Sequence, residues 1–354
     1  MLEQDLTPDL LAQVQQAVHT RTHLKIVGGN SKSFYGTPTS ATALLEVSGH
    51  RGIVSYEPSE LVVKVRAGTR LTDLTQLLTD HGQMLAFEPP GFASEATIGG
   101  TIACGFSGPR RPFAGSARDS VLGCTLINGN AECLAFGGQV MKNVAGFDVS
   151  RLMVGALGQL GVLLDISLRV VPMPEAEITV TRTLSSAHQA LELMQQWQRE
   201  PWPFSALVYD GNKLMMRLSG AETAVHSAAS QLGGDIDLNG DLFWRQLREQ
   251  QLDFFRDAEN LWRISIAPAT PLLDIEGEWL LDWGGAQRWL KSPVYSEHIH
   301  QTVAALNGHA VCFRGSDKTD WLRLEPGLMN VHKKIRQAFD PYRLLNPHRF
   351  SPEL

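Results

Sequence analysis

The chain has 354 residues, of which 43% are hydrophobic and 19% are charged, and its formal net charge is −6. These proportions exclude an intrinsically disordered chain, and the acidic balance excludes a broad basic surface for nucleic acid. A chain of this length exceeds what one hydrophobic core usually serves, so we expect two domains.

Neither the N-terminal segment nor the cysteine pattern indicates export or a metal centre. The first twenty residues are acidic and amphipathic, without the basic and apolar regions of a secretory signal, and no apolar run is long enough to span a bilayer. The four cysteines are irregularly spaced and include no C-x-x-C pair. We therefore expect a cytoplasmic protein with reduced thiols and no metal or iron–sulfur cluster of its own.

The first half of the chain is typical of short strands and helices separated by glycine loops. The predicted elements are a helix over 10–18 with Thr7 and Pro8 at its start, strands over 24–27 and 61–65, a helix over 71–78 and a strand over 162–171. Between 87 and 161 glycine is dense and long helices are not expected. Pro172 and Pro174 break the last strand, so we place a domain boundary after 173.

The second half predicts a different architecture. ITVTRTL is a strand, AHQALELMQQWQRE a helix, FSALVYDGNKLMMRLSG two strands across a turn, and AETAVHSAASQLG a helix. This order is typical of a ferredoxin-like α+β domain. WRISIAP and GEWLLDWGG add strand signals, and a helix over 327–339 precedes a proline-rich tail. We expect a second domain over 174–326 and a C-terminal segment over 327–354 that returns to the first domain.

Two glycine loops are candidate sites for a ligand with a negative charge or a flat ring. The loop Gly28-Gly29-Asn30-Ser31-Lys32-Ser33 follows a predicted strand, where backbone N–H groups can converge on an anion such as a pyrophosphate. The stretch Thr97-Ile98-Gly99-Gly100 precedes small residues that let a flat molecule approach the backbone. For each loop a purely structural use of the glycines is an equal alternative: a tight turn in the first, close helix packing in the second.

A third glycine run, Gly155 to Gly161, is not a nicotinamide dinucleotide fingerprint. The Rossmann motif G-x-G-x-x-G opens a helix, whereas this run has the spacing G-x-x-G-x-x-G and leads into a predicted strand. We interpret these glycines as bringing strand backbone close to a planar ligand.

In combination, the loops resemble the FAD-binding domain of the vanillyl-alcohol oxidase and p-cresol methylhydroxylase (PCMH) family. The segments that carry the resemblance are V-G-G-N-S-K-S…G at 27–36, P-x-x-x-x-x-A-T-I-G-G at 90–100, R-D-x-V-L-G at 118–123, K-N-V-A-G-F-D-x-x-R-L-x-V-G at 142–155, G-x-L-G-V-L at 158–163 and D-P-x-x-x-L-N-P at 340–347. Val27 stands where that family often has proline. The resemblance implies a two-part FAD-binding domain over 1–173.

A narrower resemblance, to the FAD-binding E subunits of bacterial glycolate oxidases, extends into the second half. It is carried by A-C-G-F-S-G-P-R-R-P-F at 103–113, the motif over 136–155, F-W-R-Q-L-R-E-Q-Q-L at 243–252 and D-W-G-G-A-Q-R-W-L-K-S at 282–292. It implies a complex with a second FAD-binding subunit and an iron–sulfur subunit. Such a complex oxidises glycolate to glyoxylate and passes electrons toward the respiratory chain, which would place this chain at the inner membrane through its partners.

The resemblance also implies roles for individual residues. The residues implied to bind FAD are Gly28, Gly29, Asn30, Ser31, Lys32, Pro90, Thr97, Gly99, Gly100, Ala103, Cys104, Gly161 and Val162. The first loop has no histidine, so we expect noncovalent FAD, with Cys104 as the one residue that could attach it.

Catalytic residues are less well defined. Arg110 and Arg111 follow the second loop and could bind a substrate carboxylate, or form a surface or subunit-interface pair. The histidine-rich H-x-H-x-G-D-G-N motif of catalytic relatives is reduced to His309, which we interpret as structural. Three functions follow: an FAD-binding subunit of a glycolate oxidase, a stand-alone dehydrogenase of a small 2-hydroxy acid, or a scaffold that binds no flavin. The reduced motif favours the first over the second, and the intact loops disfavour the third.

Overall fold

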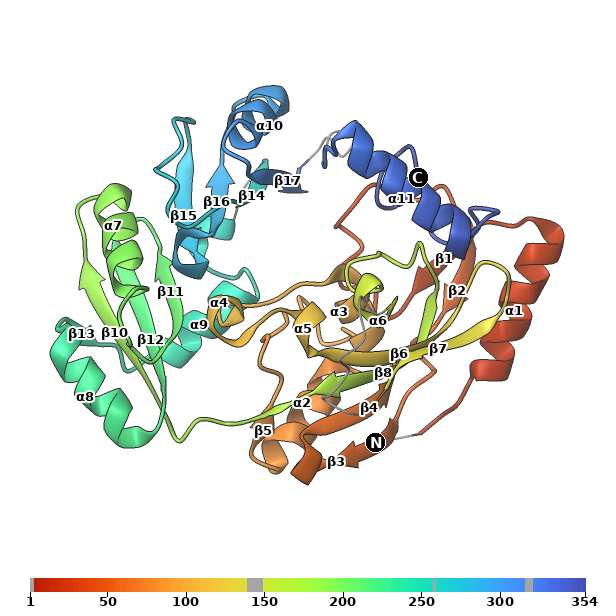
Figure 1. The fold of residues 1–354 in the computed structure, drawn as a ribbon, viewed down its shortest axis with the longest axis horizontal. Coiled ribbons are helices and arrows are strands. Elements are labelled where there is room, and N and C mark those ends of the chain that lie inside the picture. Colours follow the sequence, from red (N-terminus) through yellow and green to blue (C-terminus); the bar gives the residue numbers. More distant parts are fainter. Residues whose placement is uncertain (1–2, 139–148, 257–258, 316–320) are drawn as a thin grey trace. The chain divides into compact units, whose positions relative to one another are not determined.

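A computed structural model describes residues 3–138, 149–256, 259–315 and 321–354 (Figure 1). Residues 142–148 of the predicted motif over 142–155 lie outside these ranges. The chain divides into two compact units, of which the first comprises Met1–Ser107, Gly115–Met173 and Leu324–Leu354. The second comprises Gly108–Ala114 and Pro174–Arg323. The segment 108–114 therefore belongs to the second unit, whereas we assigned it to the first from the sequence.

The first unit is built on a five-stranded antiparallel sheet. Its strands lie in the order β3 (Ile53–Glu57), β4 (Val62–Arg66), β8 (Val162–Arg169), β6 (Val121–Ile127) and β7 (Cys133–Gly137). Two small sheets accompany it: β1 (Leu24–Val27) pairs in parallel with β2 (Ala43–Glu46), and β5 (Gln83–Met84) pairs with β9 (Val171–Pro172). The predicted strands at 24–27, 61–65 and 162–171 are β1, β4 and β8, but β8 ends at Arg169 and the predicted end of the last strand falls in β9.

Helices of the first unit contribute side chains to the same apolar core as this sheet. They are α1 (Thr7–Thr20), α2 (Leu71–Asp80), α3 (Ile98–Cys104), α5 (Ala117–Ser120), α6 (Val149–Leu152) and α11 (Pro326–Phe339), with a 3₁₀ turn at Pro58–Glu60. Leu10 and Val14 of α1 and Leu74 and Leu78 of α2 are buried at helical spacing, as the sequence predicted. These side chains join the sheet residues in one apolar core.

The start of α1 differs from the prediction. Leu6 occupies the N-cap position, so Thr7 is already helical and Pro8 follows it in the first turn. The Asp5 carboxylate accepts a hydrogen bond from the Thr7 backbone N–H at 2.9 Å. Asp5 therefore caps the helix, a role that we assigned to Thr7, because the Asp5 side chain can reach the unpaired N–H groups of the first turn.

The second unit contains the predicted ferredoxin-like arrangement. Its elements follow in the order β10 (Ala176–Thr183), α7 (Ala187–Trp197), β11 (Phe204–Tyr209), β12 (Lys213–Gly220), α8 (Glu222–Leu232) and β13 (Asp235–Ile236). The strands lie side by side as β13-β10-β12-β11, all antiparallel, so the first and third strands are central. This is the strand order of a split βαβ fold.

Four further strands extend this sheet to eight. They are β15 (Glu278–Asp282), β16 (Gln287–Lys291), β14 (Leu261–Ser265) and β17 (His309–Arg314), in spatial order. The remaining helical elements are α4 (Arg111–Ala114), α9 (Gly240–Arg248), α10 (Ser296–Ala304) and the 3₁₀ turns at Asp253–Phe255 and Trp283–Gly285. The sequence indicated β14 and β15. Among the helices of the described residues, none has the length and apolar character needed to cross a bilayer.

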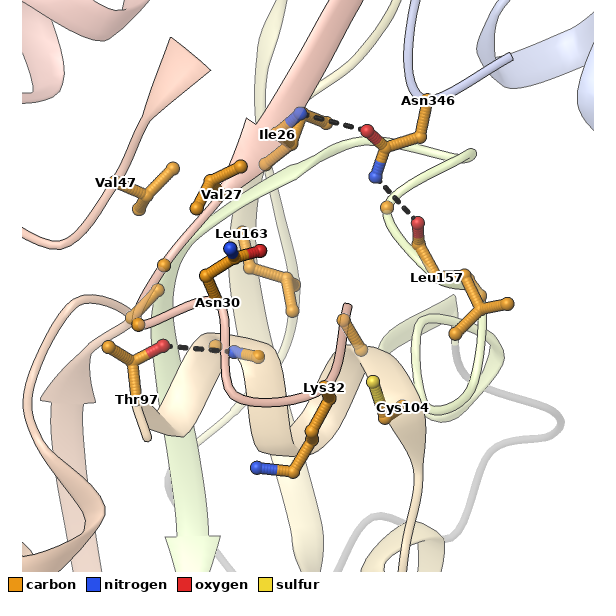
Figure 2. A pocket seen from close by; sticks show the side chains of 18 of the residues that line it. Ile26, Val27, Asn30, Lys32, Val47, Thr97, Cys104, Leu157, Leu163 and Asn346 are labelled. Carbon is orange, nitrogen blue, oxygen red and sulfur yellow. Dashed lines mark hydrogen bonds between the residues drawn. The ribbon is translucent and has the colours of Figure 1, made fainter. Parts of the chain in front are cut away.

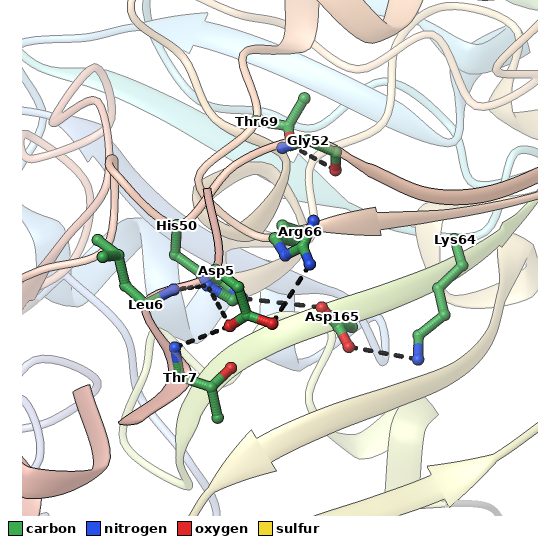
Figure 3. Close-up of polar contacts among 9 residues, drawn as sticks. All are labelled: Asp5, Leu6, Thr7, His50, Gly52, Lys64, Arg66, Thr69 and Asp165. Atoms are coloured by element: carbon green, nitrogen blue, oxygen red, sulfur yellow. Dashed lines mark hydrogen bonds and ion pairs between the residues drawn. The ribbon is translucent and has the colours of Figure 1, made fainter. Parts of the chain in front are cut away.

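A buried histidine connects the N-terminal segment to the main sheet (Figure 3). His50 is completely buried, and its Nδ1 accepts a hydrogen bond from the Leu6 backbone N–H at 3.0 Å. Its Nε2 faces a carboxylate oxygen of Asp165, on β8, at 3.7 Å. Asp5 completes the cluster through an ion pair with Arg66, on β4, at 3.3 Å.

We expect Asp5→Asn to lower stability in a pH-dependent way. The hydrogen bond from the Thr7 backbone N–H, followed by the interactions with the Thr7 side chain and Arg66, lowers the pKa of Asp5 to about 2. A lowered carboxyl pKa contributes stability that is complete above about pH 4 and is lost as the pH falls toward 2. Because Asp5 is largely exposed, the contribution is below about 1 kcal/mol.

The measurement is urea unfolding of the wild type and the variant at neutral pH and at a series of acidic pH values. The difference in unfolding free energy should shrink as the pH falls below about 4. A difference that stays constant down to the lowest pH would show that the Asp5 charge plays no part.

Candidate functional site

A cavity in the first unit brings together most of the residues predicted to bind the cofactor (Figure 2). Eleven of the thirteen line it: Gly28, Gly29, Asn30, Ser31, Lys32, Thr97, Gly99, Gly100, Ala103, Cys104 and Gly161. The cavity measures about 130 Å³, and an adjoining one of about 550 Å³ shares the wall formed by Val27–Asn30 and Thr97. Together they are of the size of small-molecule sites in proteins.

The two glycine loops are in direct contact. A Cβ atom on Gly29 would lie 1.5 Å from the Glu95 carbonyl oxygen, and one on Gly28 would lie 2.3 Å from the Thr97 hydroxyl oxygen. Both distances are far below any real carbon–oxygen contact, so only glycine allows this approach. Gly28 and Gly29 are therefore required by packing, which is the structural alternative that we kept open. This packing also sets the position of the first loop.

The first loop presents backbone donors that the protein does not use. Among the described residues, no acceptor receives the N–H groups of Gly28, Gly29, Asn30 and Ser31. Asn30 has φ of +55°, in the left-handed region. A left-handed residue in a short turn directs neighbouring N–H groups toward one point, which creates a concave site for an anion. The loop thus has the geometry expected for binding phosphate oxygens.

The second loop contributes a surface rather than donors. Thr97 caps α3, because its hydroxyl accepts from the Gly100 N–H at 3.3 Å. The N–H groups of Ile98 and Gly99 donate to the carbonyls of Thr69 and Ala67, at 2.9 and 2.7 Å. The first turn of α3 is therefore satisfied by the protein itself, and we assign no anion to it.

Gly100 differs from the other glycines of the pocket. A Cβ atom there would meet only the Thr97 hydroxyl, at 3.3 Å, whereas one on Gly99 would lie 2.7 Å from the Ala67 side chain. Gly100 is helical, has no positive φ and lines the cavity. Protein packing therefore does not account for a glycine in this helix, where alanine is about 1 kcal/mol more favourable. A flat group lying on α3 would account for it.

Lys32 lines the pocket, but its ammonium group forms hydrogen bonds with other residues of the protein. Its side chain is buried, and the ammonium donates to the Gly91 carbonyl and the Ser31 hydroxyl, each at 3.2 Å. The lysine therefore links the first loop to the 90–92 segment. The two remaining predicted residues, Pro90 and Val162, do not line the cavity. Val162 is fully buried in β8, opposite Ile127.

Sequence reasoning missed the C-terminal residues of the site. Asn346 and Arg349 line the cavity, although about 320 residues separate them from the first loop. The Asn346 side chain accepts from the Ile26 N–H at 2.8 Å and donates to the Leu157 carbonyl at 2.8 Å (Figure 2). The D-P-x-x-x-L-N-P motif was the available signal, but we did not attach it to the pocket.

Apolar side chains form the rest of the wall and were also missed. They are Ile26, Val27, Val47, Ala67, Met153, Ala156, Leu157 and Leu163. The third glycine run contributes Gly158 and Gly161. A Cβ atom on Gly158 would lie 2.6 Å from the Asn346 amide nitrogen, and one on Gly161 2.9 Å from a methyl carbon of Leu126. These two glycines thus let neighbouring segments close the cavity.

The two arginine candidates do not belong to this pocket. Arg110 and Arg111 lie in the 108–114 segment of the second unit. Arg110 is buried, with its guanidinium 2.5 Å from a Glu177 carboxylate oxygen and 3.0 Å from the Ser219 hydroxyl. The Arg111 guanidinium lies over the Trp283 ring, 4.3 Å from its centre. Arg110 therefore forms an ion pair within the second unit and does not line the pocket, and binding of a substrate carboxylate, one of the two alternatives kept open for it, stays a prediction.

Comparisons with known proteins agree with the geometry of the pocket. Residues 6–137 match the family model described as FAD binding domain. The chain is 47% identical to glycolate oxidase subunit GlcE of Escherichia coli over 352 residues, which covers 99% of both chains. The likeness to two other proteins is confined to part of the chain. D-lactate dehydrogenase of Anaerostipes hadrus is 30% identical over 44% of this chain and 31% of its own length.

Glycolate oxidase subunit GlcD of Bacillus subtilis is 31% identical over 40% of this chain and 30% of its own length. Among solved structures, an alkyldihydroxyacetonephosphate synthase superposes with a TM-score of 0.68 at 16% identity, covering 96% of this chain and 74% of that one. This supports the predicted fold class, an FAD-binding domain of the PCMH type joined to an α+β domain. The chain belongs to the family of glycolate oxidase subunit GlcE, and it contains an FAD-binding domain.

Proposed function

We propose that this chain is the FAD-binding subunit of a glycolate oxidase complex, which oxidises glycolate to glyoxylate and passes the electrons to partner subunits. The full-length likeness to GlcE of Escherichia coli supports this assignment. The name of the Bacillus subtilis relative, subunit GlcD, indicates that glycolate oxidase has several subunits. The proposed partners are a second FAD-binding subunit and an iron–sulfur subunit, and through them the chain would reach the respiratory chain at the inner membrane.

The residues of the pocket fit FAD. The unused N–H groups of Gly28 to Ser31 suit the pyrophosphate, and the apolar wall formed by Val47, Met153 and Leu163 suits an aromatic ring. The observation that carries the proposal is Gly100, a helical glycine that faces the cavity and that the protein's own packing does not require. When bound, FAD supplies the capacity to accept two electrons from a hydroxy acid.

We infer from the lining of the pocket that FAD is bound noncovalently and that a partner carries out most of the substrate oxidation. No histidine lines the cavity, and Cys104 at the end of α3 is its only thiol among the described residues. The two cationic side chains that line it, Lys32 and Arg349, donate to backbone carbonyls. A substrate carboxylate needs a cation that is available to it, and a proton acceptor must lie beside the reacting carbon. The described pocket residues offer neither.

We expect the purified chain to carry flavin and to leave it oxidised in the presence of glycolate. Absorbance spectra of the chain alone should show the two flavin bands, and heat or acid should release the cofactor because no bond attaches it. Anaerobic glycolate should bleach these bands only when the partner subunits are added. A colourless chain that cannot be reconstituted with FAD would overturn the proposal, and bleaching without partners would favour the stand-alone dehydrogenase.

We expect Gly100→Ala to weaken FAD binding without destabilising the chain. Within the protein the added methyl group would contact only the Thr97 hydroxyl, at 3.3 Å, which a small shift of that side chain relieves, so the unfolding free energy of the FAD-free chain should change by less than about 1 kcal/mol. The same methyl group would project into the cavity, so the Kd for FAD should rise by at least about tenfold. Fluorescence titration with FAD and urea unfolding measure the two quantities.

Gly29→Ala is the contrasting variant. Its Cβ atom would collide with the Glu95 backbone, so we expect a loss of about 1–3 kcal/mol in unfolding free energy even without FAD. Comparing Gly29→Ala with Gly100→Ala distinguishes a glycine that packing requires from a glycine that the ligand requires. Equal losses of stability in the two variants would show that Gly100 is also a packing glycine.

A further inference from the structure

We propose that the C-terminal segment 340–349 is a latch on the cofactor loop, and that Arg349 is a positioning residue that couples docking of this segment to FAD affinity. The proposal rests on the proposed function, because it concerns the same pocket. All of its contacts lie within the first unit.

Arg349 binds the first loop through three backbone carbonyls. One terminal nitrogen of its guanidinium donates to the Thr37 carbonyl at 3.2 Å, and the other donates to those of Lys32 at 3.2 Å and Ser33 at 2.7 Å. Lys32 and Ser33 directly follow the four residues whose N–H groups are unused, and Thr37 lies four positions further along the chain. A planar guanidinium can reach several acceptors in a fixed geometry, and a charged donor strengthens each hydrogen bond.

The loop in turn binds the backbone of the segment. The Thr37 N–H donates to the Arg349 carbonyl at 3.1 Å, and its hydroxyl donates to the His348 carbonyl. Gly36 has φ of +84°, and a Cβ atom there would lie 2.5 Å from the Arg349 carbonyl oxygen. The loop and the segment therefore donate hydrogen bonds to each other, and only glycine at position 36 allows their backbones to approach this closely.

Asn346 extends the same contact to two other walls of the pocket. Its side chain joins Ile26, at the end of β1, to Leu157 in the third glycine run, as Figure 2 shows. The Gln159 side chain also donates to the Asn346 carbonyl, at 3.2 Å. Docking of the segment thus orders the first loop, β1 and the 157–161 run at once.

The base of the segment is fixed by a buried carboxylate. Asp340 is completely buried and accepts the N–H groups of Leu344 and Leu345, each at 2.9 Å, while Arg336 of α11 lies 3.5 Å away. The Leu24 N–H donates to the Leu344 carbonyl at 2.7 Å, which joins the segment to β1. The turn that delivers Asn346 and Arg349 to the pocket is therefore held at its start, independently of the cofactor.

Two events that order the same loop in the same conformation favour each other. Arg349 restrains the loop from the carbonyl side, and an anion bound to the unused N–H groups would restrain it from the other side. Whichever binds first removes conformational freedom that the second would otherwise have to remove. Docking of the segment should therefore raise FAD affinity, and FAD should tighten docking of the segment by the same factor.

The test compares Arg349→Gln and Arg349→Lys with Arg343→Gln, which removes an exposed arginine from the same segment. Fluorescence titration gives the Kd for FAD, and hydrogen exchange of the FAD-free chain reports order at residues 30–37. We expect Arg349→Gln to raise the Kd by about tenfold and to speed exchange at Ser33, Tyr35 and Thr37. Arg349→Lys should recover part of both effects, and Arg343→Gln should match the wild type.

Hydrogen exchange of the unmodified chain supplies the reciprocal measurement and does not depend on folding of any variant. Adding FAD should slow exchange at the N–H groups of Asn346 and Arg349, which lie beyond the fixed base of the segment and donate to the Leu24 and Asn346 carbonyls. No slowing there, or an unchanged Kd in Arg349→Gln, would overturn the latch while FAD binding by the wild type still upheld the proposed function. Failure of the wild type to bind FAD would overturn the proposed function instead.

Discussion

The approach of Gly29 to the Glu95 carbonyl is the constraint on which the rest of the site depends. It brings two loops that are more than sixty residues apart in the chain into backbone contact, a distance that any side chain would prevent. Once the first loop is held there, its unused N–H groups face a cavity whose opposite wall is α3, and Gly100 leaves that wall flat. The proposed phosphate recognition and ring stacking thus both depend on one close packing contact.

Local signals in the sequence predicted much of the fold. The strand pattern over 24–27, the alternation of strands and helices after 174 and the turn between the two strands of FSALVYDGNKLMMRLSG are properties of neighbouring residues, and each element formed as predicted. The assignment of 108–114 to the first unit was wrong because it depends on a contact between residues that are distant in the sequence. That segment joins the second unit through the buried ion pair between Arg110 and Glu177, a contact across 67 residues that no local pattern encodes.

The same distinction applies to the site. Glycine loops are visible in the sequence because their backbone geometry restricts the residue type, and the family resemblance that these loops carry named eleven pocket residues in advance. Apolar wall residues such as Val47 and Leu163 resemble any core residue, and Arg349 gains its role only from carbonyls more than 300 positions away. Their place in the pocket depends on tertiary packing, which composition and spacing do not determine.

The division of the first unit along the chain has a consequence for the order of assembly during synthesis. Translation delivers the whole of Pro174–Arg323 before it delivers Asn346 and Arg349. A nascent chain can form the main sheet and join the two glycine loops early, since domains fold progressively from the N-terminus. It cannot close the pocket until the second unit has emerged. Cofactor capture is therefore a late event, and a chain interrupted within the second unit would have the glycine loops without the means to hold them.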